Sequence, residues 1–158
     1  YNVGSASTNN REEGFLDVMK ETPGINMLVD NQYAGATVDE AIKKAEELVE
    51  QLKQADGIYC PNESVTRAML ITLKKHGLAG KVKFVGFDSS EQLIAGINDG
   101  HIHGLVVQDP FQMGYKGVKA VVDHVAGTQI EAEIDTGAKL VTSENIARPE
   151  IKSLLGIE

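Results

Sequence analysis

The spacing of apolar residues switches between two patterns along most of the chain. Short apolar runs of strand length occur at 25–29, 57–60, 82–87 and 102–107, and stretches with helical spacing of apolar residues separate them. This alternation predicts an α/β fold with a doubly wound parallel sheet whose two faces are covered by helices. We expect a single domain, because 158 residues, of which 42% are hydrophobic, can supply one core.

Helix start and stop signals support this prediction. Thr8 to Asn10 offer N-caps for a first helix that ends at Pro23. Thr37 and Glu40 have the spacing of a capping box, which predicts a helix that continues to about Leu52. Asn62 precedes a further helix, and a later one runs from 111 to 126 and ends at Gly127.

The pattern changes after Gly127. Residues 130–135 and 138–141 alternate between apolar and polar types, which predicts a short antiparallel or edge strand pair near the C-terminus. Pro149 then opens a short last helix.

Three apolar runs end in polar residues that form hydrogen bonds, namely Asn62, Asp88 and Gln108. The carboxyl ends of parallel strands meet at one edge of a sheet, so we expect these side chains to form one binding wall. Arg11, near the start of the first helix, adds a planar fork of donors. A guanidinium, a carboxylate and amides together can bind vicinal hydroxyls, which give and accept hydrogen bonds at once.

Each of these residues also has an ordinary structural explanation. Asn62 and Asp88 are common N-cap types, Gln108 fits an exposed loop, and Arg11 fits a surface position beside Glu12. Taken singly, none indicates function. Their convergence at the strand ends is what favours a binding site.

Other chemistries have little support in the residues. A net charge of -8 argues against nucleic acid as a partner, since phosphate contact requires a basic surface. Neither a serine with a histidine at a comparable strand end nor a glycine-rich phosphate loop occurs, so we predict no catalytic residue and no cofactor. His101 and His103 share a face without a third ligand, so we expect solvated strand histidines and no metal. Cys60 is expected to be a buried, unreactive thiol.

Five segments, in order, carry a resemblance to a known family: Ser7-Thr8 through Arg11 to Gly14-Phe15, Pro61 to Ser64, Val85 to Asp88, Asn98 to Ile102, and Val107 to Gly114. With them the chain resembles the ligand-binding domain of type I periplasmic sugar-binding proteins, the ribose-binding-like solute-binding proteins of ABC transporters. Proteins of this family have two lobes. The resemblance implies that residues 1–158 form a single domain, the C-terminal lobe, and that 109–158 includes segments that cross back to the other lobe.

The resemblance also implies roles for particular residues. It assigns sugar hydrogen bonds to Arg11, Asn62, Asp88 and Gln108, and Phe87 matches an aromatic residue that lines the same pocket.

Tyr33 lies in a loop where some members place another aromatic residue. The implied ligand is a monosaccharide or a polyol, the implied partner is the membrane permease of an ABC transporter, and the implied location is periplasmic or extracellular, lipid-anchored or soluble. Without the other lobe, the apolar face of the 111–126 helix predicts self-association of this chain.

Three alternatives remain open. The effector-binding core of a LacI-type transcription repressor shares the fold, although Asn98 to Ile102 replaces the proline-containing segment usual there. What is encoded before Tyr1, a signal peptide or a DNA-binding module, would separate the two. An enzyme of flavodoxin-like or response-regulator type would need a lysine after a late strand, whereas Lys83 lies inside one. A one-lobe piece without a function of its own is compatible with the transport prediction.

Overall fold

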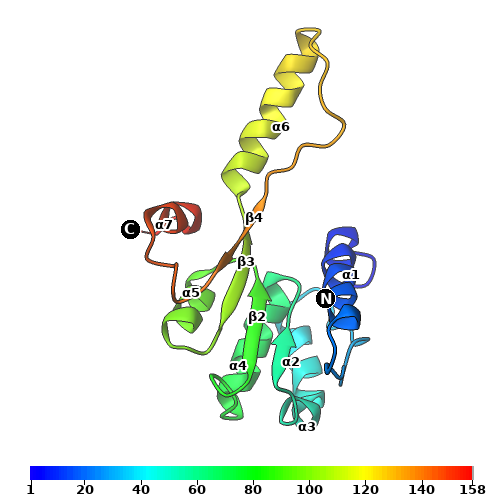
Figure 1. Cartoon of the computed structure of the whole chain (residues 1–158), viewed down its shortest axis with the longest axis vertical. Helices are drawn as coiled ribbons and strands as arrows, with labels where there is room; N and C mark the ends of the chain where they lie inside the picture. Colours follow the sequence, from blue (N-terminus) through cyan, green and yellow to red (C-terminus); the bar gives the residue numbers. More distant parts are fainter. Residues whose placement is uncertain (158) are drawn as a thin grey trace.

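Four strands form one sheet in the computed structural model, which describes residues 1–157 (Figure 1). Their order in the sheet is β1 (Gly57–Tyr59), β2 (Lys83–Phe87), β3 (Gly104–Gln108) and β4 (Ala138–Val141). β1, β2 and β3 are parallel, and β4 is antiparallel to β3. The parallel sheet and the edge strand at 138–141 are therefore confirmed. Residues 130–135 form no strand, so β4 pairs with β3 instead of with that segment.

Seven helices accompany the sheet within the described residues: α1 (Ala6–Glu21), α2 (Val38–Glu47), α3 (Val49–Leu52), α4 (Glu63–Lys75), α5 (Glu91–Asn98), α6 (Pro110–Val125) and α7 (Pro149–Leu155). Local signals explain several of their starts. The predicted capping box of Thr37 and Glu40 is present at α2. Asp109 caps α6 by accepting a hydrogen bond from the Gln112 amide at 2.9 Å, with Pro110 following at the first helical position.

The hydrophobic core lies on the face of the sheet that meets α4. A Cβ atom on Gly86 would come within 2.1 Å of Thr66 Cγ2 on α4, so Gly86 faces this helix directly. Side chains alternate along a strand, and the strand register places Ile58, Phe84 and Leu105 on the same face. Phe84 and Leu105 are fully buried there. α2 and α5 pack on either side of α4.

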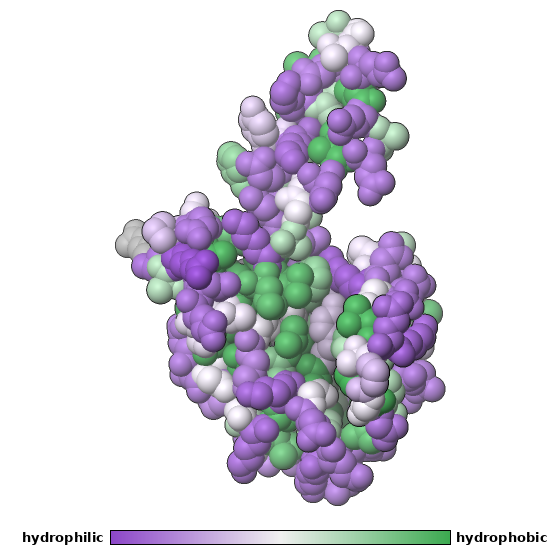
Figure 2. Space-filling model, in the orientation of Figure 1, coloured by the Kyte–Doolittle hydropathy of each residue, from purple (hydrophilic) through white to green (hydrophobic). Residues whose placement is uncertain are grey.

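The opposite face of the sheet is covered less completely. Tyr59, Val85 and Val106 point to this side, and all three are half-buried. α1 reaches the face through Phe15, whose ring stacks on Tyr59 with 4.9 Å between ring centroids. Figure 2 shows apolar residues gathered over β2 and β3 in this view. The prediction of helices on both faces is met by α4 on one side and by α1 on part of the other.

The strand predicted at 25–29 is wrong. Residues 22–36 contain neither helix nor strand, and Ile25 and Leu28 are 45% and 47% exposed. An apolar run becomes a strand when a neighbour accepts and donates its backbone hydrogen bonds, and the sheet ends at β1 before it reaches this segment. The first helix also begins earlier than predicted, with Ser5 in place of Thr8 to Asn10 at its N-cap.

α6 and the chain that returns from it to β4 project from the rest of the molecule (Figure 1). Phe111, Val118 and Val125 on this helix are 74%, 67% and 82% exposed. In residues 1–157, none of the helices combines the length and the apolar character that a membrane span requires.

Candidate functional site

The candidate site lies where the parallel strands end. Gln108 is the last residue of β3, Asp88 directly follows β2, and Asn62 lies between β1 and α4. All three side chains are half-buried. Because β1, β2 and β3 are parallel, these residues share one edge of the sheet, as the sequence predicts.

Arg11 joins this edge from α1. Its Nη1 atom donates to the Pro61 carbonyl at 3.1 Å, and its Nη2 atom donates to Gln108 Oε1 at 3.4 Å. Gln108 Nε2 in turn donates to Asp88 Oδ1 at 3.3 Å. The structure thus joins three of the predicted site residues, from α1, β3 and the end of β2, in one hydrogen-bonded chain. The two side-chain contacts of Gln108 are longer than the usual N–H···O distance, so they are weak.

Phe87 packs against the flat face of the Arg11 guanidinium. The Arg11 Cζ atom lies 3.7 Å from the centroid of the Phe87 ring, a cation–π geometry, and Phe87 is 6% exposed. This contact fixes the plane of the guanidinium and its fork of donors. Phe87 therefore presents the face of its ring to Arg11.

The backbone at Asp88 is unusual. Asp88 has a φ of 63°, the left-handed conformation that residues other than glycine rarely adopt. Its amide donates to the Val106 carbonyl at 2.8 Å, which fixes the residue against β3. The N-cap of the following helix, α5, is Ser90. The capping explanation for Asp88 is therefore wrong, and its carboxylate points instead toward Gln108.

Asn62 does cap a helix. Its Oδ1 atom accepts hydrogen bonds from the Val65 amide at 3.1 Å and from Ser64 Oγ at 3.2 Å. The structural explanation thus accounts for its carbonyl oxygen. Its side-chain NH₂ group donates no hydrogen bond among the described residues, so it retains two donors for another partner.

Tyr33 is not brought to this network. Its ring and the Tyr1 ring form a T-shaped pair with 5.4 Å between centroids, and 46% of Tyr33 is exposed. It borders a separate small depression that Glu40 and Lys43 also line.

Ser90 is a candidate that the sequence analysis missed. Its Oγ atom is buried and has no hydrogen-bond partner within residues 1–157, although the residue occupies the N-cap of α5, two positions after Asp88. A buried hydroxyl without a partner is costly, so the position suits a ligand or a water molecule. In the sequence, the two serines that directly follow Asp88 are the signal that points to this position.

His103, the second of the two predicted strand histidines, makes a backbone contact. His103 lies just before β3, and its Nδ1 atom accepts a hydrogen bond from the Phe84 amide at 3.2 Å. Desolvation by burial lowers the pKa of His103, with Lys83 adding to the effect. His103 is therefore a partly buried structural residue, not the solvated strand residue that the sequence predicted. No group of three or more potential metal ligands comes together in the described part of the chain.

Comparison with known proteins identifies the class. The sequence profile of the periplasmic binding protein domain matches residues 1–129, so the chain belongs to this family. The D-allose-binding periplasmic protein of Escherichia coli (strain K12) is 28% identical over 121 residues, which cover 77% of this chain and 39% of that protein.

Solved structures of solute-binding proteins have the same fold. A carbohydrate transporter solute-binding protein from Agrobacterium radiobacter, in complex with D-arabinose, is 33% identical with a TM-score of 0.89. An ABC transporter solute-binding protein from Agrobacterium vitis, with bound D-fucose, is 31% identical with a TM-score of 0.90. The matches cover 98% of this chain, but 52% and 53% of those proteins. The chain thus spans about half the length of these relatives.

Proposed function

We propose that this chain is one lobe of a solute-binding protein that delivers a monosaccharide or a polyol to an ABC transporter. The observation that carries this proposal is the hydrogen-bonded chain from Arg11 through Gln108 to Asp88, at the shared end of three parallel strands. Membership of the periplasmic binding protein domain family supports it. So do the relatives whose structures hold D-arabinose and D-fucose.

The proposed roles follow from the donors and acceptors on each side chain. Arg11 donates to ring or hydroxyl oxygens, and Asp88 accepts from two hydroxyls. Gln108 and the NH₂ group of Asn62 orient the remaining hydroxyls. Because the contacts of Gln108 at 3.3 and 3.4 Å are weak, a sugar hydroxyl can replace them at little cost.

Phe87 contributes by holding Arg11 in place. Tyr33 remains a proposed aromatic contact on the strength of the resemblance alone.

The rest of the protein would complete the site. We propose that segments within 109–158, α6 above all, cross to a second lobe, and that the ligand is enclosed when two lobes close by a hinge motion. The closed protein would then meet a membrane permease in the periplasm or at the outer cell surface, where it is soluble or lipid-anchored. No step of this function needs a catalytic residue or a cofactor. One lobe offers part of the contacts, so we expect the isolated chain to bind sugar with a Kd of about 1 mM or weaker.

The test is an NMR amide-shift titration of this chain with a panel of pentoses, hexoses and polyols. We expect saturable shifts at Arg11, Asn62, Asp88 and Gln108 for one class of sugar. Asparagine, like aspartate, can adopt the left-handed backbone, so Asp88→Asn removes the charge and keeps the backbone conformation accessible. We expect this variant to raise the Kd at least about tenfold, which corresponds to about 1.4 kcal/mol of binding free energy.

A matched control is Asp99→Asn, which removes an exposed carboxylate paired with Lys74, away from the candidate site. It should leave the titration unchanged. Equal affinity of wild type and Asp88→Asn would contradict the assigned site, and the absence of shifts both in this chain and in the full-length protein would contradict sugar binding.

A further inference from the structure

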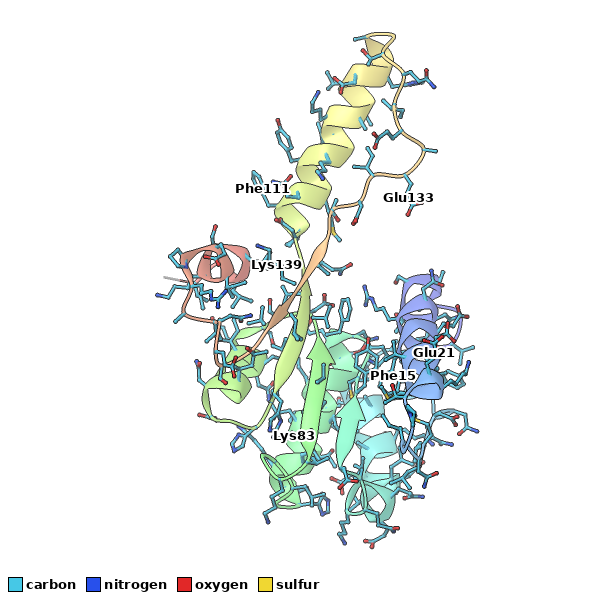
Figure 3. The ribbon with its side chains drawn as sticks, in the orientation of Figure 1. Phe15, Glu21, Lys83, Phe111, Glu133 and Lys139 are labelled. Atoms are coloured by element: carbon cyan, nitrogen blue, oxygen red, sulfur yellow. The ribbon has the colours of Figure 1, made fainter. Side chains whose placement is uncertain are left out.

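The hydrogen-bonded ladder between β1 and β2 stops short of the candidate site. It begins at the edge of the sheet where Lys83 lies (Figure 3), with a hydrogen bond of 2.9 Å from the Lys83 amide to the Asp56 carbonyl. It ends where the Cys60 amide donates to the Val85 carbonyl at 3.0 Å. In the same parallel pattern, the next bond would join the Phe87 amide to the Cys60 carbonyl. That bond does not form among the described residues.

The Thr66 hydroxyl, from α4, stands between these two backbone groups. Its Oγ1 atom accepts a hydrogen bond from the Phe87 amide at 3.1 Å and lies 3.5 Å from the Cys60 carbonyl oxygen. The hydroxyl proton goes to the Asn62 carbonyl oxygen, which is much closer at 2.7 Å. Thr66 therefore donates one hydrogen bond and accepts another. The residue is fully buried, so bulk water does not replace a partner that is lost.

The contact between Thr66 and Asn62 has an ordinary explanation, because a threonine inside a helix often donates to the carbonyl four residues before it. The contact with Phe87 is different, since it joins α4 to β2 and accepts from an amide that has no strand partner. The hydroxyl thus links two parts of the candidate site. Asn62 keeps its side-chain NH₂ group for a ligand, while Phe87 holds Arg11 and directly precedes Asp88.

We propose that Thr66 is a positioning residue for the ligand, because its hydroxyl fixes the spacing between Asn62 and Phe87. The Oγ1 atom takes the place of the next ladder bond, so no backbone bond joins β1 to β2 where the candidate site begins. Thr66 is fully buried and acts through its neighbours without touching the ligand itself. The proposal rests on the proposed function, since this spacing affects affinity only if the site binds a sugar.

Three variants separate the hydroxyl from the rest of the side chain. Thr66→Val removes the hydroxyl at nearly constant shape, and Thr66→Ser keeps the hydroxyl without the methyl group. Thr72→Val is the matched control. Thr72 lies on the same helix and is 1% exposed, but its Oγ1 atom has no hydrogen-bond partner within residues 1–157. Its hydroxyl therefore holds no other group in place.

The first readout needs no sugar. In Thr66→Val a methyl group faces the Phe87 amide, which then lacks an acceptor, so we expect its hydrogen exchange to be at least about tenfold faster. The Arg11 guanidinium lies over the Phe87 ring and experiences its ring current, so the NMR resonances of the guanidinium protons should move as well. Thr66→Ser and Thr72→Val should keep the wild-type exchange rate and resonances.

The second readout is sugar affinity, measured by amide-shift titration of this chain and of the full-length protein. Thr66→Val should raise the Kd at least about tenfold, and Thr66→Ser and Thr72→Val should stay within about twofold of wild type. An unchanged Kd for Thr66→Val, or a loss of affinity that Thr66→Ser shares, would overturn the proposal. If no form binds any sugar, the proposed function fails, whereas unchanged exchange of the Phe87 amide in Thr66→Val would overturn the role of Thr66 alone.

Discussion

At the scale of single residues, Gly86 controls how closely α4 approaches the strand that carries Phe87. The Thr66 Oγ1 atom on α4 accepts a hydrogen bond from the Phe87 amide at 3.1 Å, and this contact requires the helix to lie against the Gly86 backbone. Phe87 in turn supports Arg11. The absence of a side chain at Gly86 therefore contributes to the position of the candidate binding residues.

Gly86→Ala tests this contact. A Cβ atom at this position would lie 2.1 Å from Thr66 Cγ2, so we expect the free energy of unfolding to fall by about 1–3 kcal/mol. Urea unfolding followed by circular dichroism measures the change. Gly114→Ala is the matched control, because nothing lies within 4 Å of that position on exposed α6 and alanine favours helix. An unchanged midpoint for Gly86→Ala would show that α4 can move aside freely.

Cys60 gives a second prediction at the residue scale. Desolvation by burial raises the pKa of its thiol to about 12 from an ordinary value near 9. The neutral thiol is thus favoured in the folded state, and the stability it contributes is complete below pH 9 and is lost as the pH rises toward 12. We expect the native chain to resist thiol reagents at pH 8 and to react rapidly in urea.

Cys60→Ala separates this effect from other groups that titrate in alkali, such as Tyr1, whose hydroxyl pKa is also raised by burial. The variant should lose less stability than wild type between pH 9 and pH 12. Fast labelling of native Cys60 at pH 8 would contradict the prediction.

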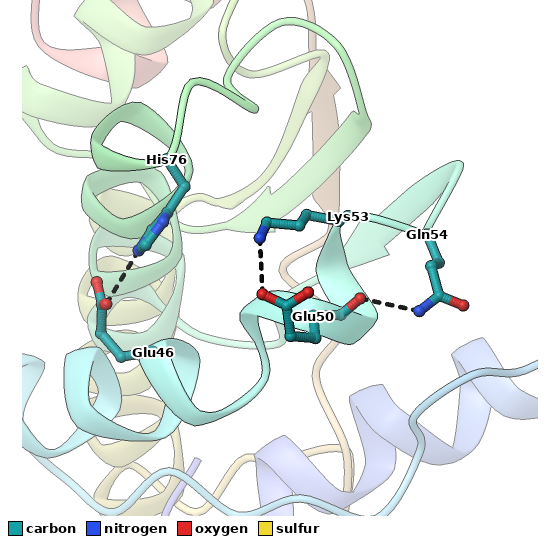
Figure 4. Close-up of polar contacts among 5 residues, drawn as sticks. All are labelled: Glu46, Glu50, Lys53, Gln54 and His76. Atoms are coloured by element: carbon teal, nitrogen blue, oxygen red, sulfur yellow. Dashed lines mark hydrogen bonds and ion pairs between the residues drawn. The ribbon is translucent and has the colours of Figure 1, made fainter.

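At the scale of elements, a cluster of charged groups joins α2 to the end of α4. Glu46 Oε2 lies 3.0 Å from His76 Nε2 and 3.1 Å from Lys75 Nζ (Figure 4 draws the His76 contact). The hydrogen bond with His76, followed by the one with Lys75, lowers the pKa of Glu46. Exposed pairs of this kind each contribute little to stability, but this one links two helices of the core.

Glu46→Gln should therefore reduce stability slightly at neutral pH. A carboxyl with a lowered pKa in the folded state contributes stability above its ordinary pKa of 4.5, and that contribution is lost as the pH falls through the folded value. We expect the thermal midpoints of wild type and variant to converge below pH 4.5. Glu50→Gln on the neighbouring helix, whose partner Lys53 lies in the same turn, should have a smaller effect. A difference that persists at low pH would show that packing, not charge, is responsible.

The elements that the sequence predicts correctly are those whose signals are local. The capping box at Thr37 and Glu40 and the apolar run at 82–87 carry their own information, and both appear as expected. The run at 25–29 depends on a neighbouring strand, which the local pattern cannot supply, and that prediction fails.

In the candidate site, too, the features that local sequence signals encode are the ones predicted correctly. The end of each parallel strand could be predicted from apolar runs, so Asp88 and Gln108 meet as expected. The exposed Tyr33 and the buried hydroxyl of Ser90 depend on how loops fold, which spacing does not specify.

At the scale of the whole molecule, α6 presents an apolar face that no other part of residues 1–157 covers. Phe111, Tyr115, Val118, Val122 and Val125 follow helical spacing and are between 58% and 82% exposed. A continuous apolar face of this kind is typical of surfaces that another protein covers. In the isolated chain the available surface is α6 of a second copy.

We therefore predict that the isolated chain self-associates through α6. Sedimentation over a range of concentrations should show a dimer, because pairing two apolar helix faces removes both from water. Val118→Lys with Val122→Lys places two charges one turn apart on that face and should give a monomer. His124→Lys adds a charge on the opposite side of the same helix, so it should leave the dimer intact. A monomer for wild type at every concentration, or equal association of all three forms, would show that α6 is not the contact surface.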